Sequence, residues 1–450
     1  MSVAMAIDVK GWCPGVLQPM QSGDGLIARV RPWCGAFGLD EARGLADAAA
    51  RFGNGHIDLT RRGNLQIRGV SEESLPGLRA ALDELDLLDH DPRTEAGRNI
   101  MVGPLAGLDP SESFDVRPVA RTLVRLLASD AALHDLPSKF GFLVDGGGTV
   151  SIAGERADIS LCAVGPEMAM GSDTPAGTQW LGLVSPDAAA EAAVAAARAF
   201  VGIAKERERV RDLSHEAFAR LRSAVTPMLR PLSAPSPAGG GGPQGRRGTR
   251  SFNTTSVDVT TTESPSALRA PPPAGEGISK RSLGVLDVGS GRIAVGIAAP
   301  FGRLEASQLR GLVAIVRDGG ATDIRLSPCR ALYAEARDGA AARAVVESAS
   351  ALGLIVNADD PALKIEACPG APACRSSSVD TRRTARQLAA RAFKGSIHVS
   401  GCAKGCARSV PADLVLVGEQ GRYNVIHNAT ARDAAERTIG TDELGSVFDV

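Results

Sequence analysis

Two stretches of the 450-residue sequence repeat the same order of apolar and polar positions. Each opens with a glycine turn and an alternating strand, continues through an amphipathic helix that ends at glycine, and finishes with two short strands. The first copy starts at Gly23 and the second at Gly289, 266 positions later. Period-two alternation indicates strands, and helical spacing indicates helices. The repeat therefore predicts a duplicated β-α-β unit of ferredoxin-like type.

The remaining sequence divides around these two copies. Each copy is followed by a longer stretch of mixed helical and strand-like pattern, and a segment rich in Pro, Gly, Ser and Thr separates the halves. Such a segment has too little apolar surface to fold alone, which is typical of a linker. We expect an α+β chain with ferredoxin-like half domains at 10–76 and 281–346, α/β domains at 77–230 and 347–450, and a flexible linker at 231–280.

The composition is that of an ordinary globular protein. It argues against some classes of binding partner. The net charge is −1 and aromatic residues make up only 4% of the chain, so nothing favours nucleic-acid binding. No apolar run reaches the roughly 18 residues of a membrane span, and Asp8 and Lys10 interrupt the region where a signal peptide is apolar. We therefore expect a cytoplasmic protein that binds neither nucleic acid nor membrane. In that reducing compartment, cysteines indicate metal binding or catalysis rather than disulfides.

Four cysteines near the C-terminus carry the most specific signal. Cys368 and Cys374 lie in C-P-G-A-P-A-C, and Cys402 and Cys406 follow in C-A-K-G-C after 27 intervening residues. Four thiolates are the usual ligands of a [4Fe–4S] cluster, and neighbouring glycines let the backbone approach it closely. The second pair has the spacing of one helical turn, which puts both thiols on the same side. A structural zinc site, buried inert cysteines and a disulfide are the alternatives.

Basic residues gather in short motifs ahead of these cysteines. Arg61 and Arg62 lie in the turn of T-R-R-G-N-L-Q-I-R, Arg68 ends that segment, Arg98 opens an R-N pair, and Lys139 follows L-P-S. A guanidinium binds a carboxylate through two parallel hydrogen bonds. These residues are therefore candidate partners for a substrate that carries several carboxylates. The alternative for each of them is an exposed position that serves solubility.

The sequence offers no recognisable site for a nucleotide cofactor. Gly289 and Gly291 follow an apolar strand, but Gly296 is misplaced for the dinucleotide fingerprint, and no Walker A motif occurs. Electrons for any redox centre must therefore come from an external donor, either a reductase or a ferredoxin.

The cysteine spacing and the repeat together resemble the sirohaem-dependent sulfite and nitrite reductases. The shared features are C-x5-C followed by C-x3-C, the segments T-R-R-G-N-L-Q and L-S-P-C-R-A-L, and the R-N motif, over nearly the whole chain. The resemblance implies a duplicated nitrite/sulfite reductase-like architecture, in which each ferredoxin-like half domain is followed by an α/β cluster-type domain. It also implies that Cys368, Cys374, Cys402 and Cys406 hold a [4Fe–4S] cluster. In those reductases the last cysteine also bridges to the haem.

Within this group, the N-terminal segment is similar to the precorrin-3B synthase branch of aerobic cobalamin biosynthesis. The similarity lies in K-G-W-C-P-G at 10–15, in the segment that follows it, and in R-N-I-M-V-G-P-L-A-G. It implies an iron–sulfur monooxygenase that uses O2 to hydroxylate precorrin-3A at C20, with formation of a γ-lactone. It further implies a mononuclear non-haem iron beside the cluster and no sirohaem. Arg61, Arg62, Arg68, Arg98 and Lys139 would bind the acetate and propionate groups.

One departure from the reductase pattern favours this branch. The reductases have two lysines in R-K-F-K, whereas this chain has S-K-F-G, so Gly141 replaces the second lysine. A small dianion held by one cation fewer is bound less tightly, and we expect the glycine to leave room for a large tetrapyrrole. The alternatives are a sirohaem-dependent sulfite or nitrite reductase and a non-catalytic iron–sulfur or zinc protein.

Overall fold

The computed structural model describes residues 12–205, 208–232, 282–391 and 393–448. Lys10 and Gly11 of the N-terminal motif, and the predicted linker beyond residue 232, lie outside these ranges. Within them the chain forms four five-stranded sheets and a set of covering helices, so the predicted α+β class is confirmed. No helix in the described ranges is long and apolar enough to cross a membrane.

The two half domains form two antiparallel sheets that exchange a strand. One sheet contains, in spatial order, β1 (Met20–Ser22), β2 (Gly25–Val30), β5 (Leu65–Val70), β4 (His56–Leu59) and β13 (Arg303–Glu305). The other contains β11 (Gly284–Gly289), β12 (Arg292–Ala298), β15 (Ala331–Ala336), β14 (Asp323–Leu326) and β3 (Ala36–Gly38). Each sheet ends on a strand from the opposite half, since β13 pairs with β4 and β3 pairs with β14. The predicted repeat is present in both halves, and strand exchange joins them into one unit.

Helices of the two half domains close a shared hydrophobic core. They are α1 (Leu39–Phe52), α2 (Leu75–Glu84), α7 (Ala306–Asp318) and α8 (Gly339–Ala351). The equivalent helices α1 and α7 pack against each other, and Leu45 and Leu312 on their apolar faces are at most 1% exposed. The core draws residues from both copies of the repeat. The domain boundaries expected at 76 and 346 fall inside α2 and α8.

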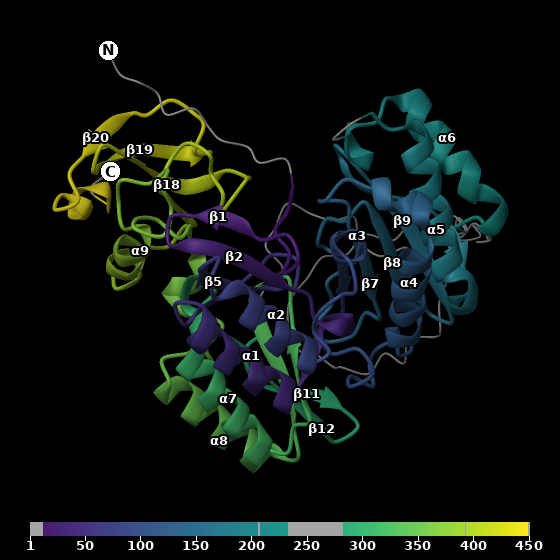
Figure 1. The fold of residues 1–450 in the computed structure, drawn as a ribbon, viewed down its shortest axis with the longest axis horizontal. Helices are drawn as coiled ribbons and strands as arrows, with labels where there is room; N and C mark the ends of the chain where they lie inside the picture. Colours follow the sequence, from purple (N-terminus) through teal and green to yellow (C-terminus); the bar gives the residue numbers. More distant parts are fainter. Residues whose placement is uncertain (1–11, 206–207, 233–281, 392, 449–450) are drawn as a thin grey trace, which may run out of the picture.

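Two α/β domains flank this unit, and their sheets share one topology. The first contains β6 (Ile100–Val102), β7 (Phe142–Asp145), β8 (Ile159–Val164), β9 (Glu167–Thr174) and β10 (Gly177–Val184). The second contains β16 (Ile365–Ala367), β17 (Ile397–Ser400), β18 (Ala412–Glu419), β19 (Arg422–Ala429) and β20 (Arg437–Ile439). In each sheet the first three strands run parallel to one another. The fourth strand pairs antiparallel with the third, and the fifth pairs antiparallel with the fourth. The duplication therefore extends to the α/β domains, which lie on opposite sides of the half-domain pair in Figure 1.

The helices of the α/β domains differ more than their sheets do. The first domain has α3 (Pro92–Gly97), α4 (Arg117–Ser129), α5 (Pro186–Ile203) and α6 (His215–Val225), and the second has α9 (Thr381–Ala389). Short 3-10 helices occupy Trp33–Gly35, Ala131–Asp135, Val210–Asp212, Thr226–Met228, Pro300–Gly302, Pro361–Lys364 and Leu444–Phe448. Alanines on the buried side of α5 allow α4 and α6 to pack closely on either side of it.

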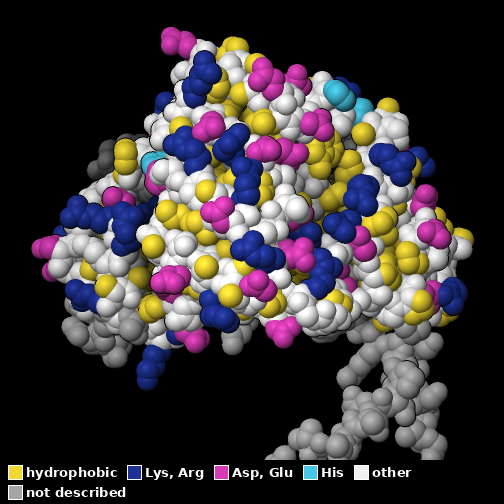
Figure 2. Space-filling model, turned by 90° about the horizontal axis from the view of Figure 1, so that it is seen from below, with side chains coloured by type: hydrophobic (Ala, Val, Ile, Leu, Met, Phe, Trp, Pro, Cys, Tyr) yellow, Lys and Arg dark blue, Asp and Glu magenta, His cyan; other side chains and the backbone are white. Residues whose placement is uncertain are grey.

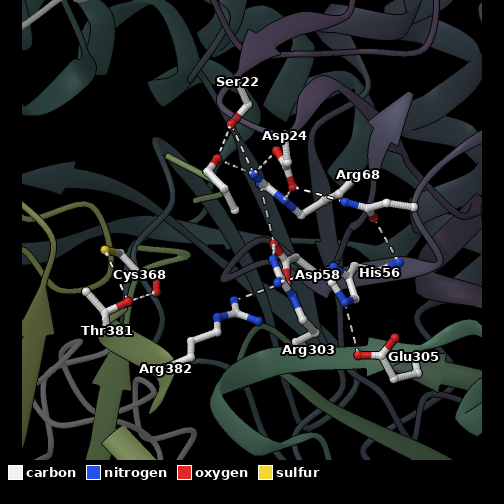
Figure 3. A network of polar contacts seen from close by, with 12 residues as sticks. Ser22, Asp24, His56, Asp58, Arg68, Arg303, Glu305, Cys368, Thr381 and Arg382 are labelled. Atoms are coloured by element: carbon white, nitrogen blue, oxygen red, sulfur yellow. Dashed lines mark hydrogen bonds and ion pairs between the residues drawn. The ribbon is translucent and has the colours of Figure 1, made fainter. Parts of the chain in front are cut away.

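A buried carboxylate joins both half domains to the C-terminal α/β domain. Asp58 on β4 is 6% exposed and accepts hydrogen bonds from Arg303 on β13, at 2.7 and 2.9 Å, and from Arg382 on α9, at 3.1 Å. Nη1 of Arg68 on β5 lies 3.5 Å from its Oδ2. Burial alone would raise the pKa of Asp58, but the three guanidiniums hold it well below its usual range. Figure 3 shows these arginines converging from separate segments.

Arg68 extends the same network to the loop between the first two cysteines. It is 2% exposed and binds both carboxylate oxygens of Asp24, at 2.6 and 2.9 Å. Its Nη2 also donates to the carbonyl oxygen of Ala373 at 3.1 Å, and Ser22 Oγ donates to that oxygen at 2.8 Å. The first hairpin is thereby fixed against the loop that carries Cys374.

We expect Asp58→Asn to lower the free energy of unfolding by about 3–5 kcal/mol, because it leaves buried guanidiniums without their carboxylate. Folding lowers the pKa of Asp58, so its contribution is full above the usual carboxyl range and is lost as pH falls through the folded-state pKa. Urea unfolding should therefore show a constant difference between wild type and variant from neutral pH to about pH 5, and a smaller one in strong acid.

Asp318→Asn, at an exposed position at the end of α7, is the matched control. It should change the unfolding free energy by no more than about 0.5 kcal/mol. An equally small effect of Asp58→Asn would contradict the joining role given to this carboxylate.

Candidate functional site

A cavity of about 460 Å³ lies where the half domains meet the C-terminal α/β domain. Its lining includes Cys368, Cys374, Cys402 and Cys406, so the structure brings the whole predicted cysteine set to one place. The turn that follows β4 forms another part of the wall, and Lys139 reaches the cavity from the first α/β domain. Every folded unit of the described chain therefore contributes to this site.

The sheet topology explains why the two cysteine pairs meet. β16 and β17 are parallel neighbours, so their carboxyl ends lie at the same edge of the sheet. Cys368 follows β16 directly, and Cys402 follows the end of β17 after Gly401. Crevices at the carboxyl ends of parallel strands are where α/β sheets commonly bind ligands. Two pairs separated by 27 residues in sequence are thus neighbours in space.

Cys368 is held in surroundings that suit a thiolate. The backbone N–H of Gly401 donates to its Sγ at 3.1 Å, and Thr381 Oγ1 donates to its carbonyl oxygen at 2.6 Å. A Cβ at Gly401 would lie 2.3 Å from Ser377 Oγ and 3.4 Å from Cys368 Sγ, so this close approach requires glycine. Burial raises the pKa of Cys368, while N–H groups of Gly401 and Gly370 oppose that rise by favouring the thiolate.

Cys406 faces the cavity, where solvent reaches it although protein surrounds it on most sides. Burial raises the pKa of Cys406 to about 11, and the other three cysteines add to the rise against the opposing charge of Lys404. A bound metal stabilises cysteine side chains as thiolates, because it replaces their protons.

The four cysteines provide the donor set that a [4Fe–4S] cluster uses. Within the described ranges, no group of three or more His, Cys, Asp or Glu side chains is arranged to hold one metal ion. An iron–sulfur cube binds each cysteine at a different corner, so the four sulfurs need not converge on one point. The shared cavity edge, the glycine at the point of closest approach and the N–H donor to Cys368 are features that such a cluster uses.

The second cysteine pair does not lie on a helix, contrary to the expectation from its spacing. Residues 401–410 form successive turns, and Gly405 has a φ of +65°, in the left-handed region that ends helical structure. The two thiols meet at the cavity because of these turns.

The rest of the cavity wall is strongly basic. Asp58 is the one acidic residue among the described lining residues. The basic lining residues are Arg29, Arg61, Arg62, Arg68, Lys139, Arg330, Arg382 and Lys404. By contrast, Figure 2 shows acidic and basic side chains interspersed over the face viewed there. A concentration of cations in one concave site favours a ligand that carries several negative charges.

The cavity arginines differ in how many of their N–H groups have hydrogen-bond partners. Arg68 is occupied by Asp24, Asp58 and Ala373, as described above. In contrast, Arg29 Nε, Arg62 Nη1, and Nε and Nη1 of Arg382 are shielded from solvent without a partner among the described residues. A buried donor left unpaired costs about 1–3 kcal/mol.

Arg98 lies apart from this cavity. It is 5% exposed, binds Asp89 at 2.7 and 3.0 Å, and stacks 3.8 Å from the centre of the Trp33 ring. Of the predicted carboxylate partners, the structure therefore brings together Arg61, Arg62, Arg68 and Lys139. Sequence reasoning missed Lys404, although it stands between two of the cysteines, and it missed Arg330 and Arg382, which only the folded chain brings to the site.

Comparisons with known proteins agree with this architecture. Residues 18–85 match the nitrite/sulfite reductase ferredoxin-like half domain. A precorrin-3B synthase from a Sinorhizobium species is 31% identical over 447 residues, which cover 98% of this chain and 87% of the relative. The chain belongs to the precorrin-3B synthase family. A ferredoxin-type sulfite reductase from Mycobacterium tuberculosis is 22% identical over 94% of this chain and 78% of its own length.

The fold of this family member is also found in a solved structure. The Mycobacterium tuberculosis NirA protein superposes with a TM-score of 0.72, over 94% of this chain and 79% of that one, at 22% identity. The predicted duplicated nitrite/sulfite reductase-like architecture is therefore confirmed as a fold.

The space at Gly141 of this precorrin-3B synthase family member is taken by the protein itself. A Cβ built there would lie 2.4 Å from Arg62 Nη1 and 3.0 Å from Asn99 Nδ2, and Gly141 does not line the cavity. The expectation that this glycine gives direct room to a macrocycle is wrong. It gives room to the Arg62 guanidinium instead, and the N–H of Gly141 donates to Asp158 Oδ2 at 2.8 Å.

We expect Gly141→Ala to displace the Arg62 guanidinium while costing no more than about 1–3 kcal/mol of stability, because the obstructing atom ends a flexible side chain. A crystal structure of the variant checks the displacement, and thermal unfolding checks the stability. Gly154→Ala is the control, because no atom lies within 4 Å of a Cβ at that position. An unmoved Arg62 in the Gly141→Ala structure would contradict the role assigned to the glycine.

Proposed function

We propose that this chain is a precorrin-3B synthase, which hydroxylates precorrin-3A at C20 with O2 while the ring A acetate closes a γ-lactone. The observation that carries the proposal is the 31% identity to a precorrin-3B synthase over 98% of the chain. The basic cavity beside the four cysteines supports it independently, because the substrate is a macrocycle that carries acetate and propionate groups.

The four cysteines are proposed to hold a [4Fe–4S] cluster. The support is their common cavity edge, the N–H donor to Cys368 and the room that Gly401 leaves beside its sulfur. When bound, the cluster supplies single electrons for the reductive activation of O2. The further mononuclear iron stays a prediction of the family resemblance, because the described residues contain no ligand group for it.

The chain's own residues are proposed to bind and orient the macrocycle. Arg29, Arg62 and Arg382 line the cavity, and their guanidiniums are proposed to bind substrate carboxylates there. Lys139 and Lys404 contribute cationic side chains on the same wall. Holding carboxylates at several fixed points orients one edge of the ring toward the cysteines and lowers the entropy that the reaction must otherwise lose.

The electron balance requires a partner. Insertion of one oxygen atom from O2 releases the other as water, and this consumes two electrons and two protons. Without a nucleotide motif in the sequence, we assign the electrons to an external reductase or ferredoxin. We place the enzyme in the cytoplasm, where reducing conditions keep thiols available for a cluster.

Anaerobically purified protein should contain iron and sulfide and should convert precorrin-3A in the presence of O2 and an artificial reductant. Incorporation of ¹⁸O from labelled O2 into the product, followed by mass spectrometry, checks the source of the oxygen. Strong visible bands from a tightly bound haem-type macrocycle, with reduction of sulfite or nitrite, would instead establish the sirohaem-dependent reductase.

Loss of one thiolate should remove the cluster. We expect Cys406→Ala to lower the iron and sulfide content to less than about one tenth of wild type and to abolish turnover, because the cube is left with three protein ligands. Cys162→Ala, at a buried position outside the cavity, is the control and should keep its iron. Full iron content in Cys406→Ala would count against ligation by this residue.

Substrate affinity should depend on Arg62, whose side chain lines the cavity. We expect Arg62→Gln to weaken binding of precorrin-3A about 10- to 100-fold, since a charge-assisted hydrogen bond contributes about 1.5–3 kcal/mol. Anaerobic titration that follows the absorption of the substrate measures this change. Arg292→Gln removes a half-exposed arginine that pairs with Glu335 away from the cavity and should leave the affinity within about twofold. Equal affinities for the two variants would refute the assignment of Arg62.

A further inference from the structure

A buried glutamate connects the cysteine loops to the turn that carries Arg61. Glu366 lies on β16, two residues before Cys368, and is 2% exposed. Its Oε2 accepts a hydrogen bond from Arg408 Nη1 at 2.9 Å, and its Oε1 is ion-paired with Arg61. The two oxygens of this carboxylate therefore bind arginines from two separate parts of the fold.

Arg408 fixes the second cysteine loop. It stands two residues after Cys406, and its side chain is 10% exposed. Besides Glu366, it donates from Nε to the carbonyl oxygen of Val410 at 3.1 Å and from Nη2 to that of Pro411 at 2.6 Å. Through Arg408, Glu366 ties the end of the second cysteine loop to the strand that leads into the first.

Arg61 connects the cavity to Glu366. It lies on the turn between β4 and β5, next to Arg62, and its side chain lines the cavity with 41% exposure. A guanidinium carries five N–H donors in a fixed plane. A carboxylate that enters the cavity at this turn therefore draws on the positive charge that also compensates Glu366.

A neighbouring histidine adds no charge to the group formed by Glu366, Arg61 and Arg408. His398 on β17 stands opposite Glu366 in the parallel ladder and is 0% exposed. Burial, together with the charges of Arg408 and Arg61, lowers the pKa of His398 to about 4, so the ring is neutral at physiological pH. Neither ring nitrogen has a hydrogen-bond partner within the described chain.

We propose that Glu366 is a positioning residue that couples occupancy of the cavity to the redox centre at the four cysteines. This inference rests on the proposed function, because it requires a cluster at those residues. A substrate carboxylate bound to Arg61 neutralises part of the positive charge of Arg61. The negative charge of Glu366, close to Cys368, is then less compensated. Negative charge near a cluster makes its reduction harder. Binding of substrate therefore lowers the reduction potential, and reduction weakens substrate binding by the same factor.

The test is an anaerobic redox titration of the full chain, followed by electron paramagnetic resonance, with and without saturating precorrin-3A. In wild type we expect the substrate to bind about tenfold more weakly to the reduced protein, which equals a downward shift of about 59 mV for a one-electron couple. In Glu366→Gln we expect the difference to fall below about threefold, because the charge that Arg61 compensates is absent.

Matched variants separate coupling from general damage. Glu366→Asp keeps the charge and should keep most of the shift. Asp89→Asn, which breaks the buried pair with Arg98 outside the cavity, should leave the shift unchanged. If Glu366→Gln does not assemble a cluster, Arg61→Gln serves in its place, since it leaves the pair between Glu366 and Arg408 intact, and the same loss of the shift is expected.

The outcomes distinguish this inference from the proposed function. Equal shifts in wild type, Glu366→Gln and Arg61→Gln would overturn the coupling while leaving the cluster assignment untouched. The absence of any shift in cluster-loaded wild type would overturn it as well. A wild-type protein without iron and sulfide would overturn the proposed function, and the coupling with it.

Discussion

The ionised carboxylate of Asp58 is the contact on which the assembly of this protein depends. Its arginine partners come from β5, from β13 and from α9, so a single buried charge connects both halves of the duplication with the domain that carries the cysteines. A carboxylate is stable at 6% exposure because these guanidiniums compensate it. The Asp58 network also determines the geometry of the cavity, because its members Arg68 and Arg382 line the cavity.

The cavity concentrates positive charge that the protein only partly neutralises. Arg61, Arg68 and Arg382 have carboxylate partners in Glu366, Asp24 and Asp58, although Arg382, like Arg62, keeps shielded donors without a partner among the described residues. An arrangement of this kind is costly for the empty protein, because like charges repel and buried donors are unsatisfied. Negative charge bound in the cavity would offset the repulsion among these cations. Cations that lie at separate points of a cavity match a large substrate better than a small anion, because a large substrate presents a different carboxylate to each cation.

The duplication has produced two α/β domains with one sheet topology and different chemistry at the equivalent edge. In the second domain the loops after β16 and β17 carry the cysteines. In the first, β7 ends at Asp145, which is 1% exposed and accepts hydrogen bonds from Ser151 Oγ at 2.6 Å and from Ile152 N at 3.1 Å. Nearby, burial raises the pKa of Glu112 to about 7. At this edge the first copy pairs Asp145 with its own residues, and it contributes Lys139 to the cavity of the second.

The sequence by itself determined the duplicated β-α-β repeat, the α+β class and the cysteine set, because periodicity and spacing are local properties that the chain displays directly. It also identified Arg61, Arg62, Arg68 and Lys139 as residues of one site. Only the tertiary structure decided that β3 and β13 exchange sheets, that Gly141 makes room for Arg62, and that Arg98 packs on Trp33 away from the cavity. It also decided which arginines are occupied by carboxylates and which are available. Such pairings join residues that lie up to 324 positions apart, and no local pattern specifies which charges will meet when the chain folds.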